Sequence, residues 1–161
     1  MAPGMKSGRG LDLRRFRRSI RCRMTEKATS RKKSKGPNPR ELDVEISFLE
    51  GLIRRDPAYV DALQLLGDDY TQRGRFEEGL QVDQKLAELE PNNPLSFYNL
   101  ACSLSLTGKL EDAFRALELA LDLGYRDFKW MSRDPDLKAL RKHAKYARLR
   151  EKIRRMKIDV E

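Results

Sequence analysis

From residue 41 onward, apolar residues recur every three or four positions and are separated by polar or charged ones. Leu63, Leu66 and Tyr70 have this spacing, which places them on one face of an α-helix. The same spacing predicts that eight further apolar residues belong to the core: Phe76, Leu80, Phe97, Leu100, Leu104, Leu110, Phe114 and Leu117. The pattern therefore predicts an all-α domain.

The chain aligns with itself after a shift of thirty-four residues. The matched pairs are Pro57 with Pro91, Leu66 with Leu100, Gly74 with Gly108, Phe76 with Leu110, Glu77 with Glu111, Glu78 with Asp112, and Leu80 with Phe114. The glycines suit helix C-termini, where they adopt the left-handed conformation without strain, and the prolines suit positions near helix starts. These coincidences indicate an internal repeat.

The repeat carries recognisable motifs. The first unit reads Leu63-x-x-Leu66-Gly67-x-x-Tyr70, Gly74, Phe76-Glu77-Glu78-Gly79-Leu80 and Glu90-Pro91-Asn92-Asn93; the second reads Phe97-x-x-Leu100-Ala101, Gly108 and Leu110-Glu111-Asp112-Ala113-Phe114. In these motifs the chain resembles the tetratricopeptide-repeat family, whose units are pairs of antiparallel helices. The resemblance implies an α-solenoid of about two full repeats with capping helices.

The resemblance also implies domain boundaries. It implies a cap helix at 41–55 that resembles a second helix without its partner, repeats at 60–93 and 94–127, and a degenerate terminal repeat at 128–157, as is common in bacterial members. Two residues depart from the family pattern. Asp83 replaces an apolar residue, which we expect to loosen the packing, and Tyr125 replaces a proline, which indicates that the array is ending.

Residues 1–40 have a different composition. They hold fourteen of the 34 Lys and Arg residues and only two of the 25 acidic ones, within a net charge of +9. The stretch Arg31-Lys32-Lys33-Ser34-Lys35-Gly36-Pro37 has no apolar periodicity, so we predict a disordered basic arm. Residues 1–23 could instead be an over-extended start, with Met24 the initiator. Their arginine-rich, acid-poor segment 11–23 would also suit an organelle transit peptide.

The two cysteines, Cys22 and Cys102, do not form the framework of a secreted disulfide protein, and we expect free thiols in the cytoplasm. No apolar run approaches the length of a membrane span, so we expect no membrane insertion.

The sequence offers little for catalysis. The single histidine, His143, has no neighbouring cysteines or patterned carboxylates, which favours a structural role over a metal site. Cys102 has no base partner and is interpreted as a packed helix residue rather than a nucleophile. We therefore expect a protein that is not an enzyme and needs no cofactor.

In the family, the first helix of each repeat lines a concave groove, which suits a peptide. The resemblance places in this groove Asp61, Gln64, Asp68, Thr71, Leu95, Tyr98, Asn99, Cys102, Lys129 and Arg133. Asn99, Lys129 and Arg133 correspond to part of the carboxylate clamp of chaperone-binding members, but Gln64 and Asp68 replace the clamp residues of the first unit. The acidic side of the groove instead indicates a basic or neutral ligand.

Two functions follow. The leading one is a scaffold that binds a protein or peptide segment in the groove. The alternative is a nucleic-acid-associated protein that contacts phosphates through Arg31, Lys32, Lys33 and Lys35 of the arm and through the basic C-terminal helix. The oligomeric state is left open by the sequence.

Overall fold

The computed structural model describes residues 38–158, which belong to one unit of the chain, residues 37–161. Every regular element in this part is helical, as the periodicity predicts. The basic arm, with Arg31, Lys32, Lys33, Lys35 and Cys22, lies outside the described residues except for 38–40.

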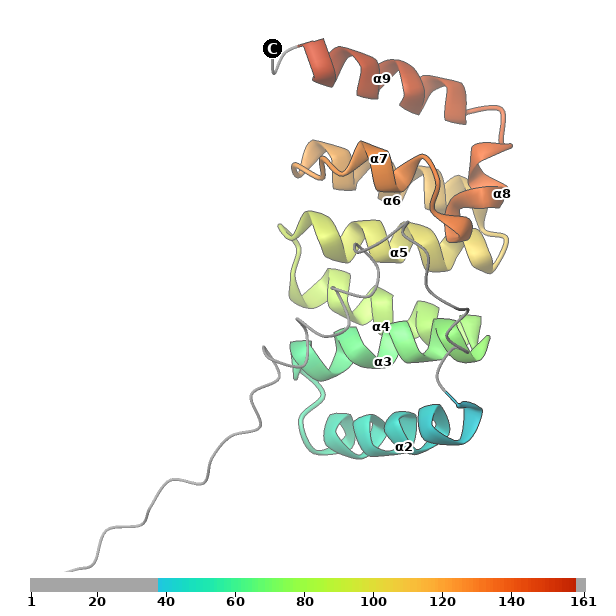
Figure 1. Cartoon of the computed structure of the whole chain (residues 1–161). Coiled ribbons are helices and arrows are strands. Elements are labelled where there is room, and N and C mark those ends of the chain that lie inside the picture. The colour runs from blue at the N-terminus through green and yellow to red at the C-terminus, as the bar shows by residue number, and fades with distance from the viewer. Residues whose placement is uncertain (1–37, 159–161) are drawn as a thin grey trace, which may run out of the picture. The chain divides into compact units, whose positions relative to one another are not determined.

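Five consecutive helices form the main stack (Figure 1). They are α2 (Pro39–Arg55), α3 (Val60–Arg73), α4 (Phe76–Leu89), α5 (Pro94–Leu106) and α6 (Leu110–Asp122), and each packs against the next. The helix pairs α3–α4 and α5–α6 span residues 60–89 and 94–122. Three short elements follow, α7 (Phe128–Met131), the 3₁₀ helix η1 (Pro135–Leu137) and α8 (Lys138–Arg141), and then the longer helix α9 (Tyr146–Ile158).

The turns inside the two repeats are alike. Gly74 and Gly108 have φ values of 79° and 76°, the left-handed conformation in which glycine carries no Cβ strain. The next N–H in each turn closes the helix end, with 2.8 Å from Arg75 N to Tyr70 O and 2.9 Å from Lys109 N to Leu104 O. This confirms the role predicted for the glycines.

The prolines of the repeat do not stand at helix starts. Pro57 lies in the turn before α3, which begins at residue 60, and Pro91 lies in the turn before α5. Pro94 is the first residue of α5, where its missing N–H is harmless, and the Asn93 side chain caps that helix by accepting from Leu95 N at 3.0 Å.

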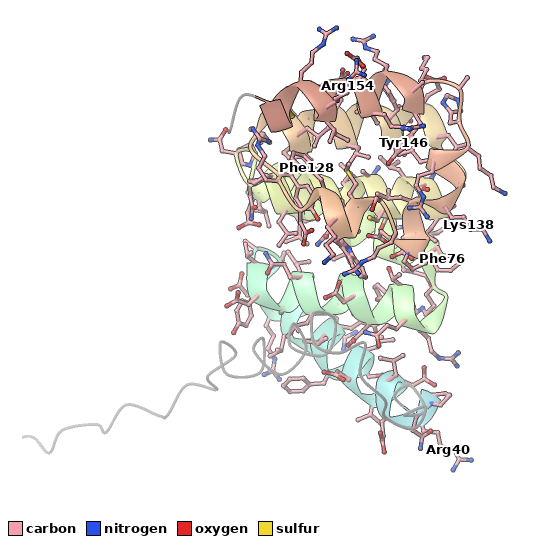
Figure 2. The ribbon with its side chains drawn as sticks, turned by 45° about the horizontal axis from the view of Figure 1, so that its top comes forward. Arg40, Phe76, Phe128, Lys138, Tyr146 and Arg154 are labelled. Carbon is pink, nitrogen blue, oxygen red and sulfur yellow. The ribbon has the colours of Figure 1, made fainter. Side chains whose placement is uncertain are left out.

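Charged side chains lie at both ends of the stack, among them Arg40 on α2 and Arg154 on α9 (Figure 2).

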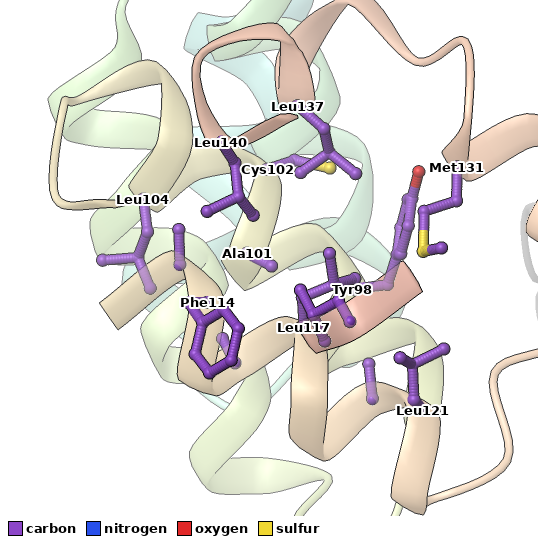
Figure 3. Packing of buried hydrophobic residues seen from close by; sticks show 14 of the residues in the cluster. Tyr98, Ala101, Cys102, Leu104, Phe114, Leu117, Leu121, Met131, Leu137 and Leu140 are labelled. Carbon is purple, nitrogen blue, oxygen red and sulfur yellow. The ribbon is translucent and has the colours of Figure 1, made fainter. Parts of the chain in front are cut away.

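Apolar side chains fill the layer around α5 and α6 (Figure 3). The fully buried ones there include Leu117, Leu121, Met131, Leu137, Leu140 and Leu149. Of the predicted core, Phe76 is 37% exposed and therefore lies at the surface, and Phe97, Leu100 and Leu110 are only partly buried.

Asp83 lies buried between three helices and does not leave a gap. Its Oδ2 accepts a hydrogen bond of 2.5 Å from Ser103 Oγ of α5. A Cβ at position 67 of α3 would lie 3.0 Å from Asp83 Oδ1, so Gly67 supplies the space for this carboxyl group. The family's apolar contact is thus replaced by a buried polar one, and the expected loosening is not seen.

Burial raises the pKa of Asp83 to about 7. In the unfolded chain this carboxyl ionises near pH 4, so between pH 4 and 7 the unfolded chain binds fewer protons than the folded one. The stability that this group contributes is present below pH 4 and is lost as the pH rises through 7.

We expect Asp83→Asn to flatten this dependence, since asparagine still accepts from Ser103 but does not ionise. Relative to the wild type, the loss of unfolding free energy from pH 5 to pH 8 should shrink by about 1–3 kcal/mol. Urea denaturation at both pH values measures it, with the exposed Asp112→Asn as the control. An unchanged slope in Asp83→Asn contradicts the assignment.

Candidate functional site

The first helices of the two repeats, α3 and α5, carry most of the residues predicted for the groove, and the structure treats the two helices differently. On α3, Asp68 is exposed, whereas three other predicted residues are half-buried: Asp61, Gln64 and Thr71. On α5, Leu95 is 36% exposed and Asn99 is half-buried, but Tyr98 and Cys102 are only 4% and 9% exposed. The expectation that Tyr98 and Cys102 line an open groove is wrong.

Residues 125–141 cover this part of α5. The Tyr125 ring stacks on the Tyr98 ring, with centroids 4.1 Å apart and an interplanar angle of 8°. Tyr98 Oη donates a hydrogen bond of 2.6 Å to Asp134 Oδ2, and the Cys102 thiol lies 3.8 Å from the same oxygen. Leu137 and Met131 belong to the same buried apolar cluster as Tyr98 and Cys102 (Figure 3).

Asp134 organises the covering segment. Its Oδ1 accepts a hydrogen bond of 3.0 Å from the Asp136 N–H at the start of η1, and its backbone oxygen accepts one of 2.6 Å from Arg141 Nη1. The residue is 3% exposed. One side chain therefore caps η1 and also holds it against α5, so the chain itself fills the groove at the second repeat.

An acidic strip remains on the α3 side of the covering segment. Burial by surrounding protein, and then the charge of Asp136, raise the pKa of Asp68 to about 6, although its surface is open to solvent. Burial and the charge of Asp134 raise the pKa of Asp136 to about 6. Asp68 is therefore open to solvent and at the same time close enough to Asp136 for the charge of that carboxyl group to act on it. Cationic groups that approach it would stabilise the ionised carboxylates.

Asp69 lies next to this strip and is almost completely buried. Burial, Glu45 and Asp68 raise the pKa of its carboxyl to about 7, and its Oδ2 has no hydrogen-bond partner among the described residues. Burial and the two neighbouring carboxyl groups therefore all favour the neutral form of Asp69.

The other predicted groove residues have local partners. Gln64 Nε2 lies 3.3 Å from Glu90 Oε2, an oxygen that also accepts hydrogen bonds from Asn93 and Ser96. Lys129 is exposed, and the Arg133 guanidinium lies 5.5 Å from the centre of the Trp130 ring. Gln64 is thus part of the junction between the repeats, and Arg133 packs on an aromatic ring of its own segment.

The basic residues of α9 largely face acidic partners. Lys152 Nζ lies 2.6 Å from Asp122 and 3.8 Å from Glu118, and Arg148 lies 3.5 Å from Glu118, so these pairs link α9 to α6. Arg154 and Arg155 both pair with Glu151 of α9 itself. The Lys157 side chain lies outside the described part of the structure.

His143 has a structural setting, as predicted: its side chain is half-buried and its Nε2 lies 3.4 Å from Glu111. Burial raises the pKa of the Cys102 thiol, which keeps it from forming the reactive thiolate. Among residues 38–158, no three His, Cys, Asp or Glu side chains come together to hold a metal ion, and no helix is long and apolar enough to cross a membrane.

Sequence reasoning missed Asp134 and Asp136. An aspartate directly before Pro135 is a helix-start signal, and it indicates the cap of η1. The signal does not indicate that the same carboxylate contacts a tyrosine thirty-six residues earlier.

Comparison with known proteins supports the repeat. A family model described as tetratricopeptide repeat matches residues 84–115, from the second half of α4 into α6. The chain is 35% identical over 79 residues to a chloroplastic protein of Arabidopsis thaliana, and this match covers 47% of the chain and 24% of that protein.

Two further relatives are similar over more of the chain. The PEX5-related protein of Homo sapiens is 31% identical over 105 residues, 65% of the chain and 15% of that protein. The peroxisomal targeting signal receptor of Komagataella phaffii is 32% identical over 90 residues, 55% of the chain and 16% of that protein. Each of these matches covers less than a quarter of the relative.

The hydrogen bond between Tyr98 and Asp134 gives a stability prediction. Tyr98→Phe keeps the ring stack but leaves a buried carboxylate oxygen without its donor, so the free energy of unfolding should fall by about 1–3 kcal/mol. Urea denaturation measures the loss, and Tyr59→Phe, in the turn before α3, is the matched control. Equal stability of the two variants would show that the bond does not hold the segment.

Proposed function

Since the chain belongs to the tetratricopeptide-repeat family, a family of protein–protein interaction modules, we propose that it is a non-catalytic scaffold that binds a basic peptide segment along the inner face of α3. The observation that carries the proposal is the proximity of Asp68 from α3 to Asp136 from η1, whose charge acts on Asp68, together with the raised pKa of each carboxyl group.

The position of the site follows from what the chain itself covers. The inner face of α5 is packed against residues 125–141, so a ligand has access to α3 and to the edge of η1. The Komagataella phaffii relative is named a targeting signal receptor. By analogy, the ligand of this chain is a segment of another protein.

Charge gives the chemistry of that segment. Asp68 and Asp136 both have carboxyl pKa values raised by burial and by a neighbouring carboxylate. A lysine or arginine of the ligand would relieve this repulsion and form charge-assisted hydrogen bonds. Leu95, at the start of α5, is exposed and offers an apolar contact to a bound segment.

The test uses a fluorescein-labelled twelve-residue peptide of alternating lysine and alanine, and a matched peptide with glutamate in place of lysine. We expect the full-length protein to bind the lysine peptide only. The double variant Asp68→Asn/Asp136→Asn should weaken binding about tenfold, because it removes two opposing charges. Fluorescence anisotropy at 150 mM salt measures the affinity.

The control variant Asp112→Asn/Glu88→Gln removes the same charge from exposed positions on α6 and α4. If it weakens binding as much as the groove variant does, the peptide follows net charge and the proposal fails. Chemical shifts of α3 amides on peptide addition give an independent readout.

The raised pKa values also predict the pH dependence of binding. Asp68 and Asp136 ionise near pH 6, so the affinity for the lysine peptide should be highest above pH 7 and should fall towards pH 5 as both carboxyls gain protons. Anisotropy titrations at pH 5.0, 6.0 and 7.5 check this, with the groove variant showing a flat profile. An affinity that rises at pH 5 would exclude these carboxylates as the binding groups.

The second candidate, binding to nucleic acid, rests on the charge of residues 1–40 and not on α9, whose bases largely pair with acids. If this candidate is right, the protein should bind a labelled single-stranded oligonucleotide with an affinity that falls steeply as the salt concentration rises. The affinity should be lost when four basic residues are replaced by alanine: Arg31, Lys32, Lys33 and Lys35. The groove variant would leave this affinity unchanged.

A further inference from the structure

Helix α2 exposes apolar side chains on its outer face. Val44 is 70% exposed and Phe48 is 56% exposed, the two most exposed of the large apolar residues among 38–156. They lie one helical turn apart, and Leu52, a further turn along, is half-buried. The opposite face is well covered, since Leu42, Ile46 and Leu49 are buried.

The repeat register explains the exposure. A shift of thirty-four residues places Phe48 on Val82 and Leu52 on Leu86 of α4. Both α4 residues are buried, and a Cβ at Gly67 of α3 would lie 3.6 Å from Val82 Cγ1, so this face of α4 packs on the first helix of its own repeat. Helix α2 corresponds to a second helix, and no first helix covers it among residues 38–158.

The missing element is therefore a helix that lies antiparallel to α2, as α3 lies antiparallel to α4. Charges along α2 indicate which helix suits this place. The first turns carry Arg40 and Glu41, and the end carries Arg55 and Asp56, all exposed. If two α2 helices meet antiparallel with Phe48 facing Phe48, residues whose numbers sum to ninety-six come opposite each other.

On the outer face of α2, this register pairs opposite charges near the helix ends and apolar groups closer to the centre. Glu41 comes opposite Arg55 of the other copy, and Val44 opposite Leu52. Glu45 comes opposite Gly51, where a Cβ would meet only the end of the Arg54 side chain, so the backbones have room to approach. A two-fold axis repeats each pair, which is what a symmetric dimer requires.

From these observations we propose that α2 is a dimerisation surface whose occupant is α2 of a second copy, antiparallel and centred on Phe48. Each copy supplies the other with the helix that its first repeat lacks. The contact is smaller than a standard interface of about 800 Å² per partner, so the dissociation constant should lie in the micromolar range.

The first experiment is sedimentation velocity of the full-length protein from about 2 to 200 μM at 150 mM salt. A concentration-dependent shift from monomer to dimer is expected. Phe48→Asp should keep the protein monomeric over the whole range, whereas Leu119→Asp, a similar change at an exposed apolar residue of α6, should leave the dimer intact. Circular dichroism of both variants reports whether they are folded.

Charge reversal tests the register. Glu41→Arg brings two arginine side chains together at this pair, and Arg55→Glu brings two glutamates together there, so each variant alone should lose affinity at least tenfold. The double variant carries the swapped pair and should regain the dimer. An equimolar mixture of the two single variants should form a heterodimer, because each then meets its complement.

The outcomes are separable. A full-length protein that stays monomeric to 200 μM overturns the proposal, whether another protein or another part of the chain covers α2. A dimer that survives Phe48→Asp lies elsewhere on the surface and also overturns it. Loss of the dimer in Phe48→Asp without rescue in the charge-swapped pair overturns the antiparallel register. These results do not depend on peptide binding at α3.

Discussion

A pair of antiparallel helices buries one apolar side between its members and leaves others for its neighbours, so a short array has two ends that need covering. Residues 38–158 hold two full repeats, α3–α4 and α5–α6, so this constraint determines most of the described structure. The chain after residue 124 covers one end, and α2 covers the other. The two solutions differ, and the difference accounts for the surfaces described above.

At the C-terminal end, the covering is thorough. Residues 125–141 pack across α5, while α9 lies on α6 with Leu149 buried and ion pairs at its edge. The buried Asp134 connects the first of these segments to α5, since it caps η1 and accepts a hydrogen bond from Tyr98. Part of the family's usual groove becomes core as a result, and the acidic carboxyls of α3 and η1 come together at its border.

The sequence predicts the repeats well because their apolar residues keep helical spacing over fourteen-residue stretches. The helices α3 to α6 and the glycine turns at 74 and 108 are confirmed for this reason. It predicts the groove only on α3. Tyr98 and Cys102 occupy groove positions in the repeat, and their burial depends on a segment of short elements, α7, η1 and α8, whose few apolar residues have no clear period.

Asp83 shows a second limit of sequence patterns. Its place in the repeat indicates a misfit, whereas the structure accommodates it through Ser103 and the open space at Gly67. Each of these three residues is ordinary in its own helix. Gly67 and Ser103 compensate for the buried carboxyl group from neighbouring helices, sixteen and twenty residues away from Asp83 in the chain. The pattern of apolar residues along one helix does not contain this information.

The covering of α5 also affects how such an array can grow by gene duplication. A copy of a repeat inserted after residue 127 would have to displace Leu137, Leu140 and the Asp134 hydrogen bonds before it could stack. A helix added before α2 would meet Val44 and Phe48, which are already apolar and uncovered among the described residues. The fold therefore favours lengthening at its N-terminal end.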